Sequence, residues 1–129
     1  MSVKYNIIQR KNPNKLDEPA KFFAGVKADG EINLKSLAKQ VAESSSTVSD
    51  TDFLAVLNEL IKVMNHHLSE GKVVKLGDFG SFQISFSSEG VDTADKVNSA
   101  LIKSNKITFY PGADLREMLH TVKYEKYKQ

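Results

Sequence analysis

The feature that most constrains this chain is one long helical stretch with apolar side chains around much of its circumference. It extends from about Asp50 to Glu70, because Ser49 and Asp52 form a capping-box pattern and Gly71 is a typical C-terminal stop. Its apolar residues are Phe53, Leu54, Val56, Leu57, Leu60, Ile61, Val63, Met64 and Leu68. Such a helix must be covered on more than one side. In a chain of 129 residues, we expect a second copy of the protein to supply part of that cover.

Beyond this helix the hydrophobic period changes to two, which is typical of β-strands. Segments 74–76 and 81–87 predict a hairpin with a turn at 77–80, and 106–110 predicts a third strand. One face of this sheet would carry Val74, Leu76, Phe82, Ile84, Phe86, Ile107 and Phe109, and the other Lys75, Ser81, Gln83, Ser85, Ser87, Lys106, Thr108 and Tyr110. Residues 88–104 interrupt the pattern, and 93–103 are expected to hold a short helix.

The N-terminal third predicts a hairpin and a first helix. Alternating segments at 3–8 and 21–27 flank a loop that contains two prolines, which neither a strand nor a helix tolerates there. Asn33 can cap a helix whose apolar residues recur at helical spacing. Those residues are Leu34, Leu37, Ala38, Val41 and Ala42. The run 44–47, rich in serine, marks the end of this helix.

The C-terminal end predicts a short helix over 114–121, with Pro111 near its first turn, and then an extended or strand-like tail. The order of elements predicts an α+β fold with three helices. We expect three parts in it: an N-terminal β extension over 1–30, a helix-and-sheet domain over 31–121 and a tail over 122–129.

Composition excludes several functional classes. The chain is 40% hydrophobic and has no cysteine, so it can form a core but no disulfide, thiol nucleophile or thiolate metal site. No apolar run reaches the roughly 20 residues of a membrane span, and the first residues lack the apolar block of a signal peptide. No serine elbow, paired carboxylates or phosphate-cradling loop is evident. We therefore expect a cytoplasmic protein with no enzymatic activity, cofactor, small-molecule substrate or membrane partner.

The net charge of +2 is unevenly distributed along the chain. Residues 1–30 carry +3, 31–71 carry −3, and 72–110 and 111–129 carry +1 each. The acidic stretch coincides with the predicted helices, and the predicted strands are basic. Any surface that binds anions should therefore lie on the strands.

Several motifs in residues 33–120 resemble the bacterial HU and integration-host-factor family of DNA-bending proteins. The most specific is the run 71–82, which contains Gly-Asp-Phe-Gly-Ser-Phe and is similar to the family's strand-turn-strand segment. Phe109-x-Pro111-Gly112-x-x-Leu115 is similar to the close of the third strand. Leu34-x-x-Leu37-Ala38 and Val48-Ser49 are similar to the two-helix start. The N-terminal segment resembles an HU-like branch that is common in Bacteroides-type bacteria.

The resemblance implies an intertwined homodimer in which the sheets form a saddle over double-stranded DNA and two β-arms reach around the minor groove. Its expected function is non-sequence-specific DNA binding in the nucleoid, through the phosphate backbone. The residues expected to bind DNA are Lys72, Lys75, Ser81, Gln83, Ser85, Lys103, Lys106 and Arg116. The arm 85–104 has no proline and no arginine, and it is slightly acidic, with Glu89, Asp92 and Asp95 against Lys96 and Lys103. Bending by proline intercalation is therefore not expected.

Other interpretations remain open. The acidic arm and the added N-terminal strands also suit an HU-fold dimer used for protein interaction or self-assembly. The loop cations Arg10, Lys11 and Lys15 could contact DNA or only keep the loop soluble. Tyr124 and Tyr127 are expected to pack against the N-terminal hairpin.

Two further motifs are explained by local structure rather than by a catalytic or metal-binding role. Asp78-Phe79-Gly80 matches a kinase motif without the rest of the kinase set, so we interpret it as a hairpin turn. The neighbouring His66 and His67 would point about 100° apart on a helix and could not share a metal ion.

Overall fold

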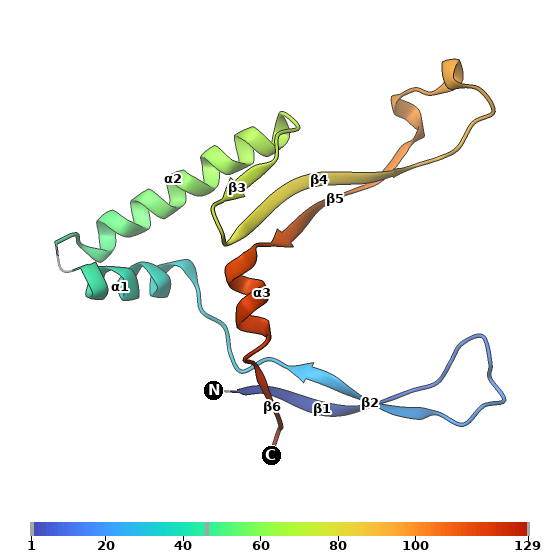
Figure 1. The fold of residues 1–129 in the computed structure, drawn as a ribbon, viewed down its shortest axis with the longest axis horizontal. Coiled ribbons are helices and arrows are strands. Elements are labelled where there is room, and N and C mark those ends of the chain that lie inside the picture. Colours follow the sequence, from blue (N-terminus) through green and yellow to red (C-terminus); the bar gives the residue numbers. More distant parts are fainter. Residues whose placement is uncertain (1, 46, 129) are drawn as a thin grey trace. The chain divides into compact units, whose positions relative to one another are not determined.

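The computed structural model describes residues 2–45 and 47–128 and forms two compact units (Figure 1). One unit consists of the described residues up to Asn33 together with those from Met118 onward, and the other is Leu34–Glu117. The described residues form three α-helices and two three-stranded sheets, which confirms the predicted mixed α+β class. The predicted boundaries at 30/31 and 121/122 stay a prediction of domain organisation.

The unit Leu34–Glu117 contains two complete helices, most of the third, and one antiparallel sheet of order β3-β4-β5. Its elements in chain order are α1 (Leu34–Ser45), α2 (Asp50–Ser69), β3 (Val74–Leu76), β4 (Gly80–Ser88), β5 (Ile102–Pro111) and α3 (Ala113–Leu119). Helix α1 begins directly after Asn33, as predicted, and ends within the serine-rich run. Ser46 of that run lies outside the described residues.

Helix α2 has the ends that its sequence predicts. The Ser49 hydroxyl accepts a hydrogen bond from the Asp52 backbone N–H at 3.1 Å, which is the first half of a capping box. At the other end, the Gly71 N–H donates to the Leu68 carbonyl at 3.0 Å and the Lys72 N–H donates to the His67 carbonyl at 3.1 Å. Gly71 has φ +84°, a conformation that glycine adopts without strain, so the helix stops where predicted.

Strands β4 and β5 form a long two-stranded arm whose tip differs from the prediction (Figure 1). The short helix expected over 93–103 is wrong, because the segment contains two single-turn 3₁₀ helices, Ala94–Lys96 and Ser99–Leu101, and β5 already begins at Ile102. Asn98 separates the two turns: its backbone is extended, and its side chain accepts a hydrogen bond from the Ala100 N–H at 2.9 Å. That local bond competes with helix formation.

The base of the arm is locked by two glycines that lie far apart in sequence. A Cβ on Gly112 would lie 2.1 Å from the Asp78 carbonyl oxygen, and a Cβ on Gly80 would lie 2.6 Å from the Tyr110 carbonyl oxygen. The Gly112 N–H donates to the Phe79 carbonyl at 2.8 Å. The two glycine-containing motifs therefore close against each other, backbone to backbone, at the junction of β5 and α3.

The N-terminal unit is built on a sheet of order β2-β1-β6. Strands β1 (Ser2–Arg10) and β2 (Lys21–Lys27) are antiparallel, which confirms the predicted hairpin, and β6 (Lys123–Lys126) runs parallel to β1. The Tyr127 N–H donates to the Tyr5 carbonyl at 2.9 Å, and Lys27 Nζ lies 5.2 Å from the centre of the Tyr127 ring. The C-terminal tail is therefore a third strand on the hairpin.

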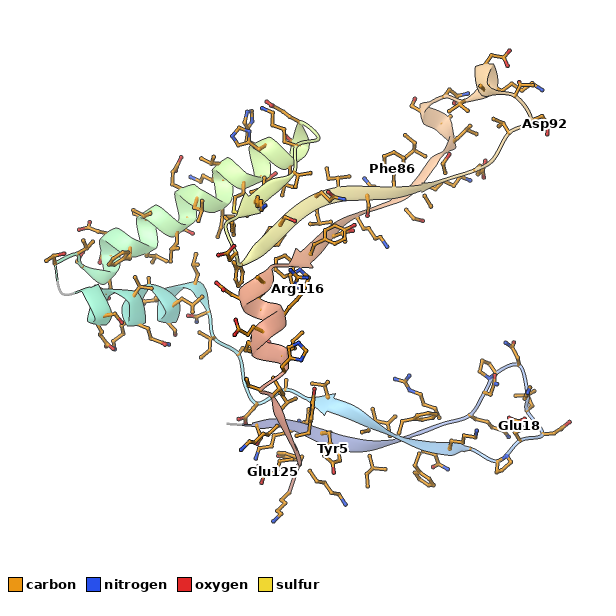
Figure 2. The ribbon with its side chains drawn as sticks, in the orientation of Figure 1. Tyr5, Glu18, Phe86, Asp92, Arg116 and Glu125 are labelled. Atoms are coloured by element: carbon orange, nitrogen blue, oxygen red, sulfur yellow. The ribbon has the colours of Figure 1, made fainter. Side chains whose placement is uncertain are left out.

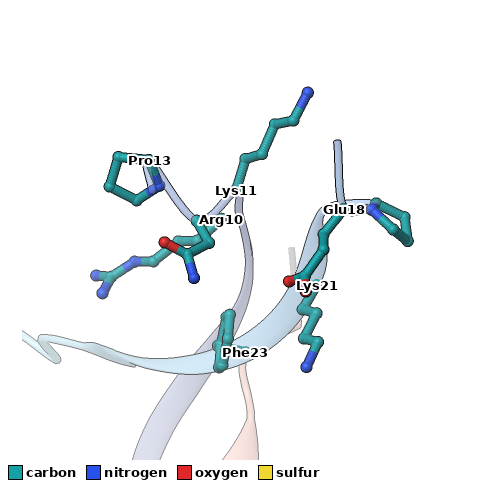
Figure 3. Close-up of a pocket in the computed structure, with 8 residues that line it drawn as sticks. Arg10, Lys11, Pro13, Glu18, Lys21 and Phe23 are labelled. Carbon is teal, nitrogen blue, oxygen red and sulfur yellow. The ribbon is translucent and has the colours of Figure 1, made fainter. Parts of the chain in front are cut away.

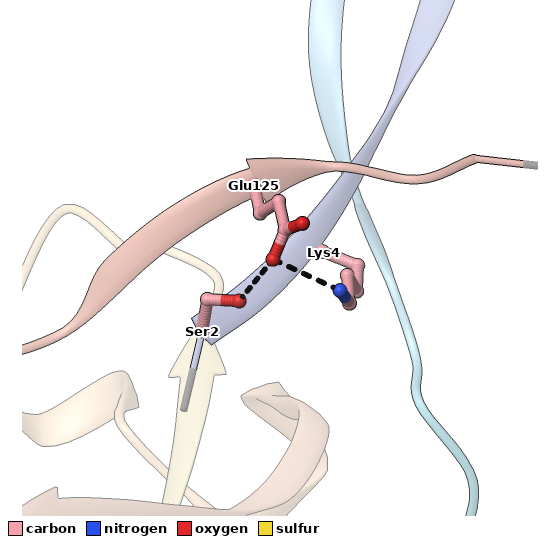
Figure 4. Close-up of polar contacts among 3 residues, drawn as sticks. All are labelled: Ser2, Lys4 and Glu125. Carbon is pink, nitrogen blue, oxygen red and sulfur yellow. Dashed lines mark hydrogen bonds and ion pairs between the residues drawn. The ribbon is translucent and has the colours of Figure 1, made fainter.

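A polar cluster fastens β6 to β1. The Glu125 carboxylate accepts hydrogen bonds from Lys4 Nζ at 3.0 Å and from the Ser2 hydroxyl at 2.9 Å (Figure 4). The hydrogen bond from Lys4, then that from Ser2, and then the charge of Lys4 hold the pKa of Glu125 below its ordinary value of 4.5.

Acid is expected to loosen this attachment. A lowered pKa in the folded state means that the ionised carboxylate stabilises the sheet above pH 4.5 and that the contribution is lost as the pH falls through the lower, folded-state pKa. Hydrogen exchange at the Tyr127 amide should therefore show protection that declines in acid for the wild type and is already reduced at neutral pH in Glu125→Gln. Glu31→Gln is the control, and equal protection in all three proteins would contradict the expectation.

The hydrophobic core is small for a chain of this composition. Ala38, in α1, is the single hydrophobic residue that is buried among those described, at 1% exposure. Helix α2 has no buried residue, and Val56 and Ile61 in it are 62% and 51% exposed. The long apolar helix is thus left uncovered over most of its surface.

Candidate nucleic-acid interface

The polar side chains of the arm lie on one face of the sheet. In the antiparallel register, Lys75 of β3 is opposite Ser81 of β4, and Ser81 is opposite Tyr110 of β5. Further along, Gln83 pairs with Thr108, and Ser85 pairs with Lys106. Because directly opposed residues point to the same side of a sheet, these side chains form one continuous polar face, as the alternation predicts.

A β-bulge adds Lys103 to this polar face. Lys103 and Lys106 are an odd number of residues apart, so in a regular strand they would point to opposite sides. The register shifts between Ser85 and Ser87, and Lys103 comes to lie opposite Ser87. Ser104, with φ +52°, is the residue whose backbone accommodates the shift. Bulges re-aim side chains in this way.

Hydrogen bonds between strands order the hydroxyl and amide groups of the polar face. The Ser85 and Thr108 hydroxyls are 2.7 Å apart, and Gln83 Nε2 donates to the Tyr110 hydroxyl at 3.4 Å. Lys75 and Lys106 make no ion pair with any described residue. Lys103 Nζ lies 2.5 Å from a Glu89 oxygen, but both side chains are more than half exposed, so this pair is weak and open to competition from another anion.

Two of the predicted residues lie away from the polar face. Lys72 is in the loop after α2, and its Nζ is 3.4 Å from a Glu70 oxygen. Arg116 is in α3, beyond the base of the arm, and its Nε donates to the Gly112 carbonyl at 3.4 Å (Figure 2). Thr108 lies on the polar face, as the alternation predicts. Ser87 and Tyr110 also lie there and were not among the residues expected to bind DNA, although the two-residue period places them on this face.

The opposite face of the same sheet is apolar and lies across a groove from α2. Phe82 is opposite Phe109, with ring centres 4.7 Å apart, and Ile84 is opposite Ile107. A groove of about 470 Å³ separates these residues from the helix. Its lining is Ile61, Met64, Asn65, Leu68, Ser69, Phe82, Ile84 and Ile107.

The outer arm combines apolar and acidic groups. Phe86, halfway along the arm, is 55% exposed, and Asp92 lies at the tip (Figure 2). Glu89 and Asp95 are also in the tip, and the arm segment 85–104 holds no proline. The tip also holds one cation, Lys96, so its three acids outnumber its positive charge, whereas the lysines of the paired strands lie on the polar face.

The other candidate motifs take structural roles. Asp78-Phe79-Gly80 forms the turn between β3 and β4, with the Phe79 N–H donating to the Leu76 carbonyl at 3.0 Å. His66 Nε2 lies 2.8 Å from a Glu70 oxygen within α2. In residues 2–45 and 47–128, no three histidine or acidic side chains converge on a possible metal site. None of the described helices has the length and apolar character needed to cross a bilayer.

A long uncovered helix, a β-arm with one polar and one apolar face, and the interlocked glycine turns define an HU-like protein. The chain belongs to the HU-HIG family, described as an HU domain fused to a wHTH, Ig or glycine-rich motif, whose model matches residues 1–126. This places it among the HU/IHF-like DNA-binding architectural proteins of bacteria, as the motifs predict.

The known proteins that are similar to this chain include the following three. The integration host factor subunit beta of Colwellia psychrerythraea is 27% identical over 86 residues, which cover 65% of this chain and 90% of that protein. The HU protein of Anabaena, solved as a DNA cocrystal, is 25% identical, with a TM-score of 0.52 over 68% of this chain and 97% of its own.

The third similarity covers the N-terminal unit as well. A candidate bacterial DNA-binding protein from Bacteroides vulgatus has a TM-score of 0.65 over 97% of this chain, at 14% identity, and so shares the fold. This chain spans 48% of that structure. The strands that extend the HU-like part therefore occur in another protein of the same fold.

Proposed function

We propose that this protein acts as a homodimer that binds double-stranded DNA through its phosphate backbone, without sequence specificity, in the bacterial nucleoid. The observation that carries the proposal is the polar face, on which the bulge brings Lys103 into line with Lys75 and Lys106. Ammonium groups and hydroxyls are groups that bind phosphate oxygens, and such contacts position a protein on DNA without reading its bases.

The dimer part of the proposal rests on the uncovered apolar surfaces. An exposed helix such as α2 and the groove beside it would leave a large apolar area in water, which a stable monomer avoids. A second copy that inserts its own apolar groups there would bury both surfaces, since a two-fold interface uses the same patch twice. Two polar faces would then be available to one duplex.

The mode of binding follows from the charge distribution. Lys75, Lys103, Lys106 and Arg116 offer four cations in each protomer, whereas the arm tip carries three acids, Glu89, Asp92 and Asp95, against one cation, Lys96. A tip with this charge enters an electronegative minor groove unfavourably. We therefore place the main contact at the base and middle of the arm and propose no bending by proline intercalation.

A salt titration tests the proposed function. Each neutralised phosphate contributes about −0.9 to the slope of log affinity against log salt, so these eight cations of a dimer contribute about −7 to the slope. Fluorescence anisotropy of a labelled duplex should show a slope at least this steep, with little change when the base sequence is scrambled. No binding at low salt would refute the proposal.

Matched triple variants locate the contact. Removing six cations from the dimer by Lys75→Gln, Lys103→Gln and Lys106→Gln should make the slope shallower by about 5. The control is Lys35→Gln, Lys39→Gln and Lys62→Gln, which removes the same charge from exposed positions on α1 and α2. We expect the control to keep the wild-type slope, and an equal loss in both variants would place the contact elsewhere.

A further inference from the structure

The N-terminal sheet has two faces of different chemistry. Side chains alternate along a strand, so the cross-strand register assigns each residue to a face. One face, here called the basic face, carries the cations Lys4, Arg10, Lys21, Lys27 and Lys123 and one acid, Glu125. The opposite face carries Val3, Tyr5, Ile7, Gln9, Phe22, Ala24, Val26, Tyr124 and Lys126. Positive charge is thus concentrated on one side of this sheet.

The cations of the basic face gather at its two ends. Lys4 is opposite Lys27 at one end, and Arg10 is opposite Lys21 at the other. Six residues of strand separate these pairs, which corresponds to about 20 Å. The surface between the two pairs is uncharged. The Ile8 side chain lies over Gly25, in the space that a side chain at position 25 would occupy.

The cations at the two ends differ in whether they already have a partner within the protein. At the first end, Lys4 is paired with Glu125 at 3.0 Å, and Lys27 lies over the Tyr127 ring. At the second end, Arg10 and Lys21 make no ion pair with any described residue.

The second end also forms a pocket. Arg10 and Lys21 line a pocket of about 360 Å³ at the loop end of the hairpin, together with Lys11 and Phe23 (Figure 3). Glu18, the acid in its lining, lies 3.5 Å from Lys15, which compensates its charge. The loop end therefore presents unpaired cations around a hollow.

We propose that the basic face is a second binding surface for the phosphate backbone of double-stranded DNA, with Arg10 and Lys21 as its main phosphate ligands. The proposal rests on the proposed function and extends the contact from the arm to the N-terminal sheet. Guanidinium and ammonium groups form charge-assisted hydrogen bonds with phosphate oxygens.

The spacing of the two ends favours a polymeric anion over a small one. A single phosphate ion would engage the cations of one end alone, whereas two cationic ends about 20 Å apart match the rise of roughly six base pairs along a duplex. A bilayer fits less well, because inserting the opposite face of this sheet, which carries Ile7, Phe22 and Val26, would turn the basic face away from anionic head groups.

Charge variants on the two faces of this sheet test the inference. Arg10→Gln with Lys21→Gln removes four cations from a dimer and should make the salt slope for the duplex shallower by about 3.6. Lys21→Gln alone should account for about half of that change. Lys126→Gln is the matched control: it removes one charge from the same sheet but from the opposite face, and it should leave the slope unchanged.

The outcomes separate this inference from the proposed function. If Arg10→Gln with Lys21→Gln keeps the wild-type slope while the triple variant on the arm loses it, the inference is overturned and the proposed function stands. If Lys126→Gln lowers the slope as much as Lys21→Gln, a surface on this face is overturned as well. Vesicles with anionic lipids are titrated in parallel, and tighter binding to vesicles than to duplex, lost in the double variant, would assign the face to membranes instead.

Discussion

Replacing Gly112 by alanine is expected to destabilise the unit Leu34–Glu117 by about 2–3 kcal/mol and to lower its melting temperature by at least about 10 °C. The added methyl group would lie 2.1 Å from the Asp78 carbonyl oxygen and 2.6 Å from the carbonyl carbon. Both are backbone atoms, so a side-chain rotation cannot relieve the clash and the backbone itself would have to shift. The turn would have to separate from the start of α3, with loss of the hydrogen bond between Gly112 and Phe79.

Two other glycines provide controls for this experiment. A Cβ on Gly90 would meet nothing within 4 Å, so Gly90→Ala should melt as the wild type does. At Gly25 the nearest atom is the end of the flexible Ile8 side chain, so Gly25→Ala should have an intermediate effect. Thermal unfolding followed by circular dichroism measures all three. A Gly112→Ala protein as stable as Gly90→Ala would show that the two motifs do not pack as described.

Replacing Ile61 by glutamate is expected to abolish the proposed dimer. Ile61 is 51% exposed in the chain and lines the apolar groove beside α2. An unpaired carboxylate buried at an interface costs about 3–5 kcal/mol, and a two-fold dimer would contain two of them. A change of this size dissociates a dimer at micromolar concentration. DNA affinity should fall with it, because a monomer presents only half of the cations.

Light scattering after size-exclusion chromatography measures this effect directly. The wild type should have twice the mass of its 14.3 kDa chain, and Ile61→Glu the mass of one chain. Asn58→Glu adds the same charge at an exposed polar position of α2 and should remain dimeric. A monomeric wild type that nevertheless binds DNA would contradict the dimer and leave the polar face as the sole basis of binding.

Much of the fold is predictable because its signals are local. The caps of α2 lie within a few residues of its ends, and the strands β1 to β4 follow from alternation over short segments. The segment 93–103 was mispredicted, since apolar spacing alone favoured a helix and the capping of the Ala100 N–H by the Asn98 side chain was not visible in the pattern. In this segment, the hydrogen bond between Ala100 N–H and the Asn98 side chain outweighs the helix preference of the apolar spacing.

The candidate site was predictable in part for the same reason. Lys75, Ser81, Gln83, Ser85 and Lys106 share a face by simple alternation, and the structure brings them together. Lys72 and Arg116 were included through the family resemblance and lie off that face. The basic face of the N-terminal sheet was missed except for Arg10, because Lys21, Lys27 and Lys123 come together only through strand pairing.

The sequence by itself determined the classes of element, their order, the two-sided character of the arm and the uneven charge along the chain. These properties depend on hydrophobic period, caps and residue types, which act over a few residues. Only the tertiary structure decided that Lys103 joins the polar face, that β6 pairs with β1 and that Gly80 and Gly112 close the base of the arm. Each of these depends on register, backbone conformation or close approach between residues distant in sequence, for which a local pattern contains no signal.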